Sequence, residues 1–148
     1  MLPMLSDTDP IDCVRCLGKV SRRESSFSVS YGAREPVSVP GSYATCDRCG
    51  EVYLAPGEGD ALHRKASEVV RKREGLLSSA EIRAIREDLG LSQCRFEQLL
   101  GVGPKTVVRW EKGTVFQNRT TDTLLRLIRD MPAVRRRLLE ESASQQRV

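Results

Sequence analysis

The chain has 148 residues, enough for one ordinary domain or two small ones, and its 5% aromatic and 30% charged residues disfavour a single large hydrophobic core. The net charge of +4 is uneven, because residues 1–60 contain 6 Lys/Arg against 9 Asp/Glu while residues 61–148 contain 18 against 11. No stretch reaches the roughly 18 apolar residues of a transmembrane helix and the first residues lack the pattern of a secretory signal, so we expect a cytoplasmic protein with no membrane partner.

After residues 1–12, which we expect to form a disordered tail, the chain contains two Cys-x-x-Cys clips, Cys13–Cys16 and Cys46–Cys49. In a reducing compartment such pairs favour a metal over disulfides. Four thiolates in two clips are the ligand set of a tetrahedral Zn²⁺ site. Because they leave no coordination position open, the site is predicted to be structural, with one zinc ion per chain held by Cys13, Cys16, Cys46 and Cys49.

Between the clips, apolar and polar residues alternate over Lys19–Tyr31 and again after the turn Gly32–Pro36. Period-2 patterning around a Gly/Pro turn predicts antiparallel strands. Gly18 and Gly50 follow the clips, and we expect both to have positive φ there. A module of this size, residues 13–60, buries little apolar surface, so the metal is expected to supply much of its stability.

Two enzyme classes were weighed against a structural metal site. A dithiol oxidoreductase would need a βαβ context and one reactive pair, and a zinc hydrolase would need an open metal position; the sequence indicates neither. His63, the only histidine, is a possible fifth ligand but is better explained as an exposed or packing residue. Cys94 is expected to be a small, semi-buried side chain. An enzyme is therefore a remote alternative.

Residues 61–75 are predicted to form a linker helix, capped by Asp60 and ended by Gly75. Its apolar stripe consists of Leu62, Ala66, Val69 and Val70. The opposite face, which we expect to be solvated, consists of Arg64, Lys65, Arg71, Lys72 and Arg73.

Three short helices are predicted next. Ser78 and Glu81 form a capping box before the first, and Ser92 caps the second. Gly103 and Pro104 are expected to open the third, with Pro104 at its first position. The inward positions of the three helices are Ile82, Ile85, Leu89, Phe96, Leu99, Leu100, Val107 and Trp110. Two short helices joined by a Gly-containing turn are typical of a helix-turn-helix.

In a helix-turn-helix the third of these helices enters the major groove of DNA with its first turns leading. Arg109 can donate two hydrogen bonds to a guanine edge, Lys105 can reach a guanine edge or a phosphate, and Val108 can contact a thymine methyl group. Glu111 is expected to be a structural ion-pair partner. The predicted DNA-binding residues are Gln93, at a phosphate, together with Lys105, Thr106, Val108 and Arg109.

Two further helices are predicted, the first capped by Thr120 or Thr121 and the second opened by Pro132. The apolar positions of the first are Leu124, Leu127, Ile128 and Met131, and those of the second are Val134, Leu138 and Leu139. Leu125 lies off the stripe, so Leu125 and Leu139 are candidates for a two-fold contact between chains. The run Arg135–Arg137 is expected to be solvated, and residues 142–148 are expected to be a frayed tail.

The run from Leu91-Ser92-Gln93 to Arg109-Trp110-Glu111-Lys112-Gly113 resembles the phage-repressor-like (Cro/C1, XRE) helix-turn-helix family. With the upstream clips, residues 13–141 resemble an MqsA-type antitoxin with a YgiT-type zinc finger. The resemblance implies a C-terminal domain that dimerises on a palindromic operator and a zinc module that binds a ribonuclease toxin. It also implies that Arg109 reads a base and that Lys105 stands where the family typically has Asn. Glu97 stands at a helix position that is usually small.

The expected fold class is therefore α+β with two domains. A small zinc-stapled antiparallel β module is followed by the linker helix and by an all-α, five-helix DNA-binding and dimerisation domain, residues 76–141. The expected function is a zinc-containing, DNA-binding transcriptional repressor, acting as the antitoxin and autoregulator of a type II toxin–antitoxin operon. A stand-alone zinc-containing transcription regulator without a toxin partner is the alternative that the sequence leaves open.

Overall fold

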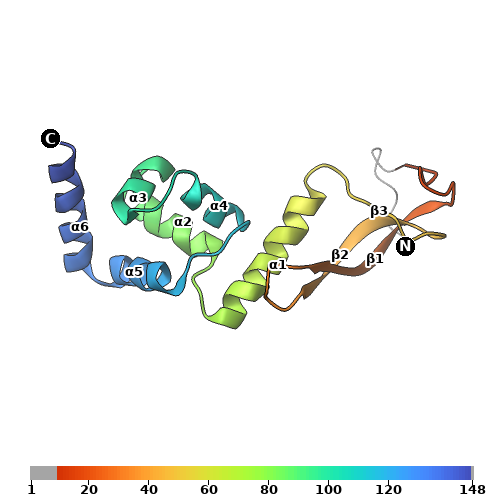
Figure 1. Cartoon of the computed structure of the whole chain (residues 1–148), viewed down its shortest axis with the longest axis horizontal. Coiled ribbons are helices and arrows are strands. Elements are labelled where there is room, and N and C mark those ends of the chain that lie inside the picture. The colour runs from red at the N-terminus through yellow and green to blue at the C-terminus, as the bar shows by residue number, and fades with distance from the viewer. Residues whose placement is uncertain (1–9, 148) are drawn as a thin grey trace. The chain divides into compact units, whose positions relative to one another are not determined.

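The computed structural model describes residues 10–147 and divides the chain into two compact units, one that ends at Ala66 and one that begins at Ser67. A small sheet is followed by six helices (Figure 1). The boundary between the units falls inside the first helix, α1 (Glu58–Glu74), rather than on either side of a separate linker helix. The residues 1–9 of the expected N-terminal tail lie outside the described residues. No helix within residues 10–147 is long and apolar enough to cross a membrane.

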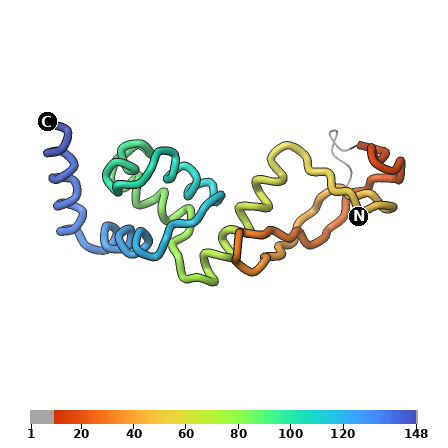
Figure 2. Tube along the Cα trace, viewed as in Figure 1, coloured from red at the N-terminus to blue at the C-terminus, as the bar shows by residue number. Residues whose placement is uncertain are grey.

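The first unit is built on the predicted antiparallel hairpin, which Figure 2 traces as two long strands running together. Strand β1 (Val20–Val29) pairs with β2 (Val37–Cys46) from Val20 opposite Cys46 to Val29 opposite Val37. A short strand that the sequence pattern did not reveal, β3 (Val52–Tyr53), pairs with the end of β2 and completes the sheet in the order β1-β2-β3.

The first part of α1 packs on this sheet. Leu62 and Ala66 are buried as predicted, and a Cβ at Gly41 of β2 would lie 2.5 Å from Leu62 Cδ2, so the close approach requires glycine. His63 has the packing role expected of it, since its ring meets Phe27 edge-on at 5.8 Å. The helix begins at Glu58, so Asp60 lies in its first turn and is not its cap.

The second unit contains the end of α1 and five helices: α2 (Ser79–Asp88), α3 (Gln93–Leu100), α4 (Thr106–Lys112), α5 (Arg119–Asp130) and α6 (Pro132–Gln145). Their shared core is formed by Leu77, Ile82, Ile85, Phe96, Val107, Trp110, Leu125 and Ile128. The capping box of Ser78 with Glu81 and the cap at Ser92 are both present. The caps of α2 and α3 are therefore as the sequence predicts.

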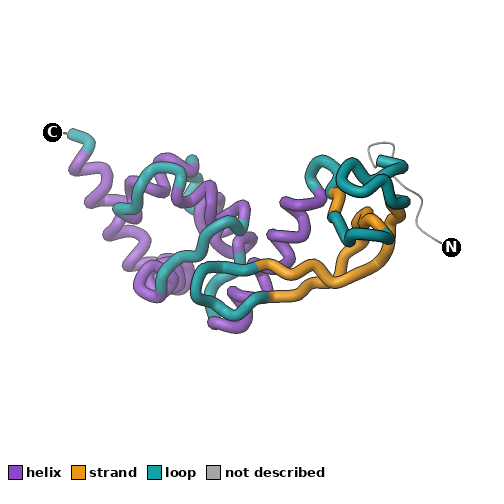
Figure 3. The backbone as a smooth tube through the Cα atoms, turned by 45° about the vertical axis from the view of Figure 1, so that its right-hand side comes forward, coloured by secondary structure: helices purple, strands orange, loops and turns teal. Residues whose placement is uncertain are grey.

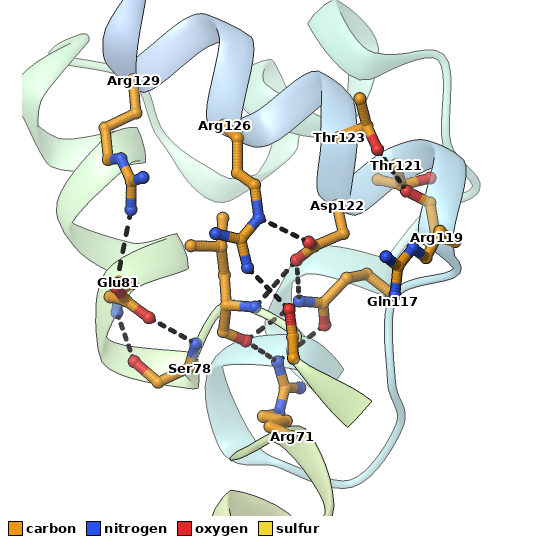
Figure 4. A network of polar contacts seen from close by, with 12 residues as sticks. Arg71, Ser78, Glu81, Gln117, Arg119, Thr121, Asp122, Thr123, Arg126 and Arg129 are labelled. Carbon is orange, nitrogen blue, oxygen red and sulfur yellow. Dashed lines mark hydrogen bonds and ion pairs between the residues drawn. The ribbon is translucent and has the colours of Figure 1, made fainter. Parts of the chain in front are cut away.

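Arg71 of α1 differs most from expectation, because it lies in the interior of the second unit instead of on a solvated face. It is 1% exposed, and its guanidinium donates to the carbonyl oxygens of Leu77, Trp110 and Val115 at 2.9–3.2 Å. It also donates to Gln117 Oε1 at 2.7 Å (Figure 4). Gln117 in turn donates to Asp122 Oδ1 at 3.0 Å. This network attaches α1 to the segments that flank α4 and α5.

Asp122 extends the same network to α5. Its carboxylate is 4% exposed and accepts from the Leu77 backbone N–H at 2.8 Å and from Arg126 Nε at 2.8 Å (Figure 4). Burial by itself raises the pKa of Asp122, but these hydrogen bonds outweigh it and hold the pKa below its usual range. The buried carboxylate of Asp122 is therefore paired with a cation of its own helix.

Four details of the C-terminal helices correct the sequence analysis. Asn118, rather than Thr120 or Thr121, caps α5, because its Oδ1 accepts from the Thr121 N–H at 2.8 Å. Leu125 is fully buried in the core and cannot form a contact between chains. Of the predicted apolar stripe of α5, Ile128 is buried in the core, whereas Leu127 and Met131 are 39% and 46% exposed. Helix α6 continues to Gln145 and so includes part of the expected tail.

Candidate metal centre and nucleic-acid interface

The two cysteine clips meet at one end of the first unit, where Cys46 is the last residue of β2 and the other three cysteines lie in the loops beside the strands, the loops being teal in Figure 3. The four Sγ atoms of Cys13, Cys16, Cys46 and Cys49 all lie within 4.8 Å of one another. Across the clips, Cys13 Sγ is 3.6 Å from Cys49 Sγ and Cys16 Sγ is 3.4 Å from Cys46 Sγ. Tetrahedral bonds of about 2.3 Å to zinc would place sulfur atoms roughly 3.8 Å apart, so the spacing suits a single metal ion.

Backbone N–H groups point at the sulfur atoms, as expected around thiolates. Arg15 N donates to Cys13 Sγ, Gly18 N to Cys16 Sγ and Arg48 N to Cys46 Sγ, each at 3.4 Å. These contacts repeat one turn geometry in both clips. They place a backbone donor beside three of the four sulfur atoms.

Tyr53 is a second-layer residue that the sequence analysis missed. Its hydroxyl donates to Cys13 Sγ at 3.2 Å and accepts from the Val14 backbone N–H at 3.1 Å. The Tyr53 hydrogen bond is the main cause that lowers the pKa of Cys13 to about 6. No periodicity marks Tyr53; only its place four residues after the second clip could have suggested this role.

The surroundings of Cys46 and Cys49 shift the pKa values of these two thiols in opposite directions. The backbone N–H groups of Cys49 and Arg48 lower the pKa of Cys46. The Glu51 backbone N–H acts to lower the pKa of Cys49, but burial and contact with the other three sulfur atoms outweigh it and raise the pKa to about 12. Crowded sulfur atoms that cannot all ionise alone are the donors that a cation stabilises as thiolates.

Gly18 is required at this centre because there is no room for a side chain, and not because its backbone has a conformation that only glycine favours. A Cβ at Gly18 would lie 2.8 Å from both Arg48 Cβ and Cys46 Sγ. The positive φ expected there belongs to the preceding residue, Leu17, at 58°, whereas Gly50 has the predicted positive φ of 75°. The four cysteines therefore fit a metal ion in donor type, spacing and supporting contacts.

In the second unit, α3 and α4 are joined by the turn 101–105. The residues that begin and cap α4 differ from those that the sequence predicts. Lys105, not Pro104, precedes the helix, in the left-handed conformation with φ 62° and without a side-chain cap. The cap comes from α3 instead: Glu97, 7% exposed, accepts from the Val107 N–H through Oε1 at 3.1 Å. The residue that the sequence marked as too large for this position thus fixes α4 against α3.

Glu111 of α4 forms the predicted ion pair, and its carboxylate also accepts a hydrogen bond from Gln93, one of the residues predicted to contact DNA. It accepts from Arg86 Nε of α2 at 2.6 Å and from Gln93 Nε2 of α3 at 2.8 Å. Burial by itself raises the pKa of Glu111, but the hydrogen bonds and the Arg86 charge outweigh it and hold the pKa below its usual range. One buried carboxylate therefore holds three helices together and occupies the Gln93 amide.

Three cations lie at α4: Lys105 immediately precedes the helix, and Arg109 and Lys112 lie within it. All three are exposed, and among residues 10–147 none of their side chains has a hydrogen-bond or ion-pair partner. The expected neighbours Thr106 and Val108 are partly exposed beside them, whereas Trp110 is 3% exposed and belongs to the core. Cys94, expected to be semi-buried, is exposed.

A model of the MqsA family, described as the antitoxin component of a bacterial toxin–antitoxin system, matches residues 11–141. The chain belongs to the MqsA antitoxin family. No curated protein shows significant similarity to the chain. The match runs through both the metal centre and the helices, so the two units of this MqsA-family protein are parts of one antitoxin.

Proposed function

We propose that this MqsA-family protein is a zinc-containing antitoxin that also represses its own operon by binding DNA. The observation that carries the proposal is the group of three exposed cations, one just before α4 and two within it, that have no partner among residues 10–147, in a chain whose family is that of antitoxins. Solvated cations without protein partners are suited to phosphates and base edges. The short α3, the turn 101–105 and α4 would form the helix-turn-helix, with α4 entering the major groove.

Within this interface each predicted residue has a role that its surroundings support. Arg109 is the principal base reader, since its planar guanidinium is free to donate two parallel hydrogen bonds. Thr106 and Val108 flank it. Because Glu111 occupies the Gln93 amide nitrogen, the phosphate contact predicted at Gln93 would use the backbone N–H groups at the start of α3. Glu97 and Glu111 hold the helix that carries these groups.

A homodimer on a palindromic operator completes the proposal. One α4 reads only a few base pairs, and two-fold symmetry doubles the contacts. With Leu125 buried in the core, the exposed apolar residues Leu127 and Met131 replace it as candidates for the two-fold contact. These two residues lie one turn apart at the end of α5 and would present a common face.

The first unit would bind the toxin, and zinc would supply the cross-link that holds its two clips together. Cys13, Cys16, Cys46 and Cys49 would hold the ion, and Tyr53 and Gly18 would support the sulfur atoms. With four protein ligands the ion would have no position for a substrate, which favours a structural site over an enzyme.

Native mass spectrometry of the full-length chain tests the proposal, first alone and then after co-expression with the product of the adjacent gene. A zinc-loaded dimer that binds the neighbouring product supports the antitoxin function. A zinc-loaded dimer without a partner would instead support a stand-alone transcription regulator. A metal-free monomer would contradict both the metal centre and the dimer.

A further inference from the structure

The four sulfur ligands of the metal centre differ in their access to solvent. Cys13 is 0% exposed, Cys46 is 4% exposed and Cys16 is half-buried, whereas Cys49, the last of the four in the chain, is exposed. A bound cation would hold all four sulfur atoms as thiolates, so access rather than ionisation decides which of them a dissolved reagent reaches first. Cys49 is therefore the thiolate that a reagent in solution meets.

Cys13 is shielded from solvent but lies in contact with Cys49. The Tyr53 hydroxyl donates to Cys13 Sγ at 3.2 Å and the Arg15 backbone N–H donates to it at 3.4 Å. Hydrogen bonds that stabilise a thiolate also reduce its nucleophilicity, which adds to the protection that burial gives. Cys13 Sγ is only 3.6 Å from Cys49 Sγ, so it is placed to react with Cys49 and not with solvent.

The close sulfur pairs join one clip to the other. Cys13 of the first clip lies against Cys49 of the second, and the Sγ atoms of Cys16 and Cys46 are 3.4 Å apart in the same sense. A disulfide in either pair would therefore link the same two segments that a metal ion links. The centre has a second way of holding its clips together, and this way depends on oxidation.

We infer that Cys49 is an oxidation site for hydroperoxides such as H₂O₂, and that its oxidation replaces the metal cross-link by a Cys13–Cys49 disulfide. The inference rests on the zinc centre of the proposed function. It adds to that function a reversible response of the first unit to peroxides.

The reaction consumes one peroxide and two thiolates. The Cys49 thiolate attacks a peroxide oxygen, so that an S–O bond forms, the O–O bond breaks and hydroxide leaves, giving a sulfenic acid. The Cys13 thiolate then attacks Cys49 Sγ, so that the S–S bond forms, the S–O bond breaks and a second hydroxide leaves. The two sulfur atoms together lose two electrons, and with two protons from solvent the peroxide becomes two water molecules. Only Cys16 and Cys46 remain as ligands, too few for a tetrahedral zinc site.

Peroxide treatment of the zinc-loaded, full-length protein tests the inference. Arg15 and Arg48 lie inside the two clips, so trypsin places each of the four ligand cysteines on a peptide of its own. Zinc content is measured first, zinc release by H₂O₂ is followed with a chromogenic chelator, and disulfides are mapped by mass spectrometry after free thiols are alkylated. We expect zinc release together with the Cys13–Cys49 peptide pair, both reversed by dithiothreitol and added zinc. The exposed Cys94 of the second unit is the internal reference and is expected to stay a free thiol.

Cys49→His and Cys16→His are matched variants, because each replaces the second sulfur of a clip by a nitrogen ligand that zinc accepts. Zinc release by peroxide is expected to be at least about 10-fold slower in Cys49→His than in the wild type, because the accessible thiolate is gone. Cys16→His keeps Cys49 and is expected to release zinc at nearly the wild-type rate. If either variant binds no zinc, the wild-type disulfide map decides.

The outcomes separate the inference from the metal centre on which it rests. A wild-type protein purified without zinc would contradict the proposed metal centre itself. A zinc-loaded wild type that keeps its zinc under peroxide would overturn the inference and leave the metal centre intact. A disulfide that joins Cys46 to Cys49, or equal release rates for Cys49→His and the wild type, would overturn it as well.

Discussion

Replacing the buried Arg71 by methionine is expected to destabilise the second unit by about 2–5 kcal/mol. Of the four acceptors that Arg71 contacts, Leu77 O keeps a hydrogen bond from Gln117 Nε2 and Trp110 O keeps one from Ser79 Oγ. Val115 O and Gln117 Oε1 lose the bonds that Arg71 donates to them. A buried acceptor left without a donor costs about 1–3 kcal/mol, while methionine avoids the desolvation of a cation.

The only tryptophan, Trp110, is 3% exposed in the core of the second unit, so its fluorescence reports the unfolding of that unit. Urea titration of Arg71→Met should lower the transition midpoint by about 1–5 M for a slope of roughly 1–1.5 kcal/mol/M. Lys72→Met is the matched control, because Lys72 is the adjacent, exposed cation of α1. An Arg71→Met midpoint within a few tenths of a molar of the wild type would refute the reasoning.

Three further predictions concern the metal centre and the pH dependence. Gly18→Ala should weaken zinc binding about 5- to 100-fold in a chelator competition, because the new Cβ would overlap Arg48 Cβ and Cys46 Sγ. The control Gly59→Ala, whose new Cβ would have its nearest contact at 3.4 Å, should bind zinc as the wild type does. Equal zinc affinities for the two variants would argue against the metal centre described above. Removal of zinc by a chelator should abolish the circular dichroism of the sheet and leave the Trp110 transition in place, and an unchanged strand signal would contradict the stabilising role of the metal. In the folded protein the pKa values of Glu111 and Asp122 are lowered, so the unfolded chain binds more protons than the folded one at low pH. The free energy of unfolding should therefore fall as the pH drops below about 4. A urea midpoint that does not change from pH 5 to pH 3 would be inconsistent with these carboxylate contacts.

Features fixed by neighbouring residues could be predicted from the sequence. The capping box at Ser78, the cap at Ser92 and the hairpin of β1 and β2 depend on residues that are close in the chain. The metal centre could be predicted although 29 residues separate its two clips, since paired Cys-x-x-Cys clips have few other uses where cysteines stay reduced. For the two caps, the hairpin and the clips, the residue types and their spacing in the sequence are enough to indicate the structural role.

The incorrect predictions concern residues whose roles depend on distant partners. Arg71 lies on the charged side of the pattern of α1, but its acceptors in 110–117 are 39–46 residues away and convert a solvated position into a buried one. Glu97 could not be recognised as the cap of α4 because helical periodicity does not show which side chain faces the next helix. Leu125 was assigned to the surface from its periodicity alone, yet the packing of α5 buries it.

The most direct test of DNA reading by α4 is the affinity of the zinc-loaded protein for the promoter of its own gene. Arg109→Ala is expected to weaken binding by about 1–3 kcal/mol and to relax specificity at one base pair of each half-site. Arg136→Ala, which removes an exposed arginine of α6, should bind nearly as tightly as the wild type. Equal operator affinity and specificity for Arg109→Ala and the wild type would contradict the account.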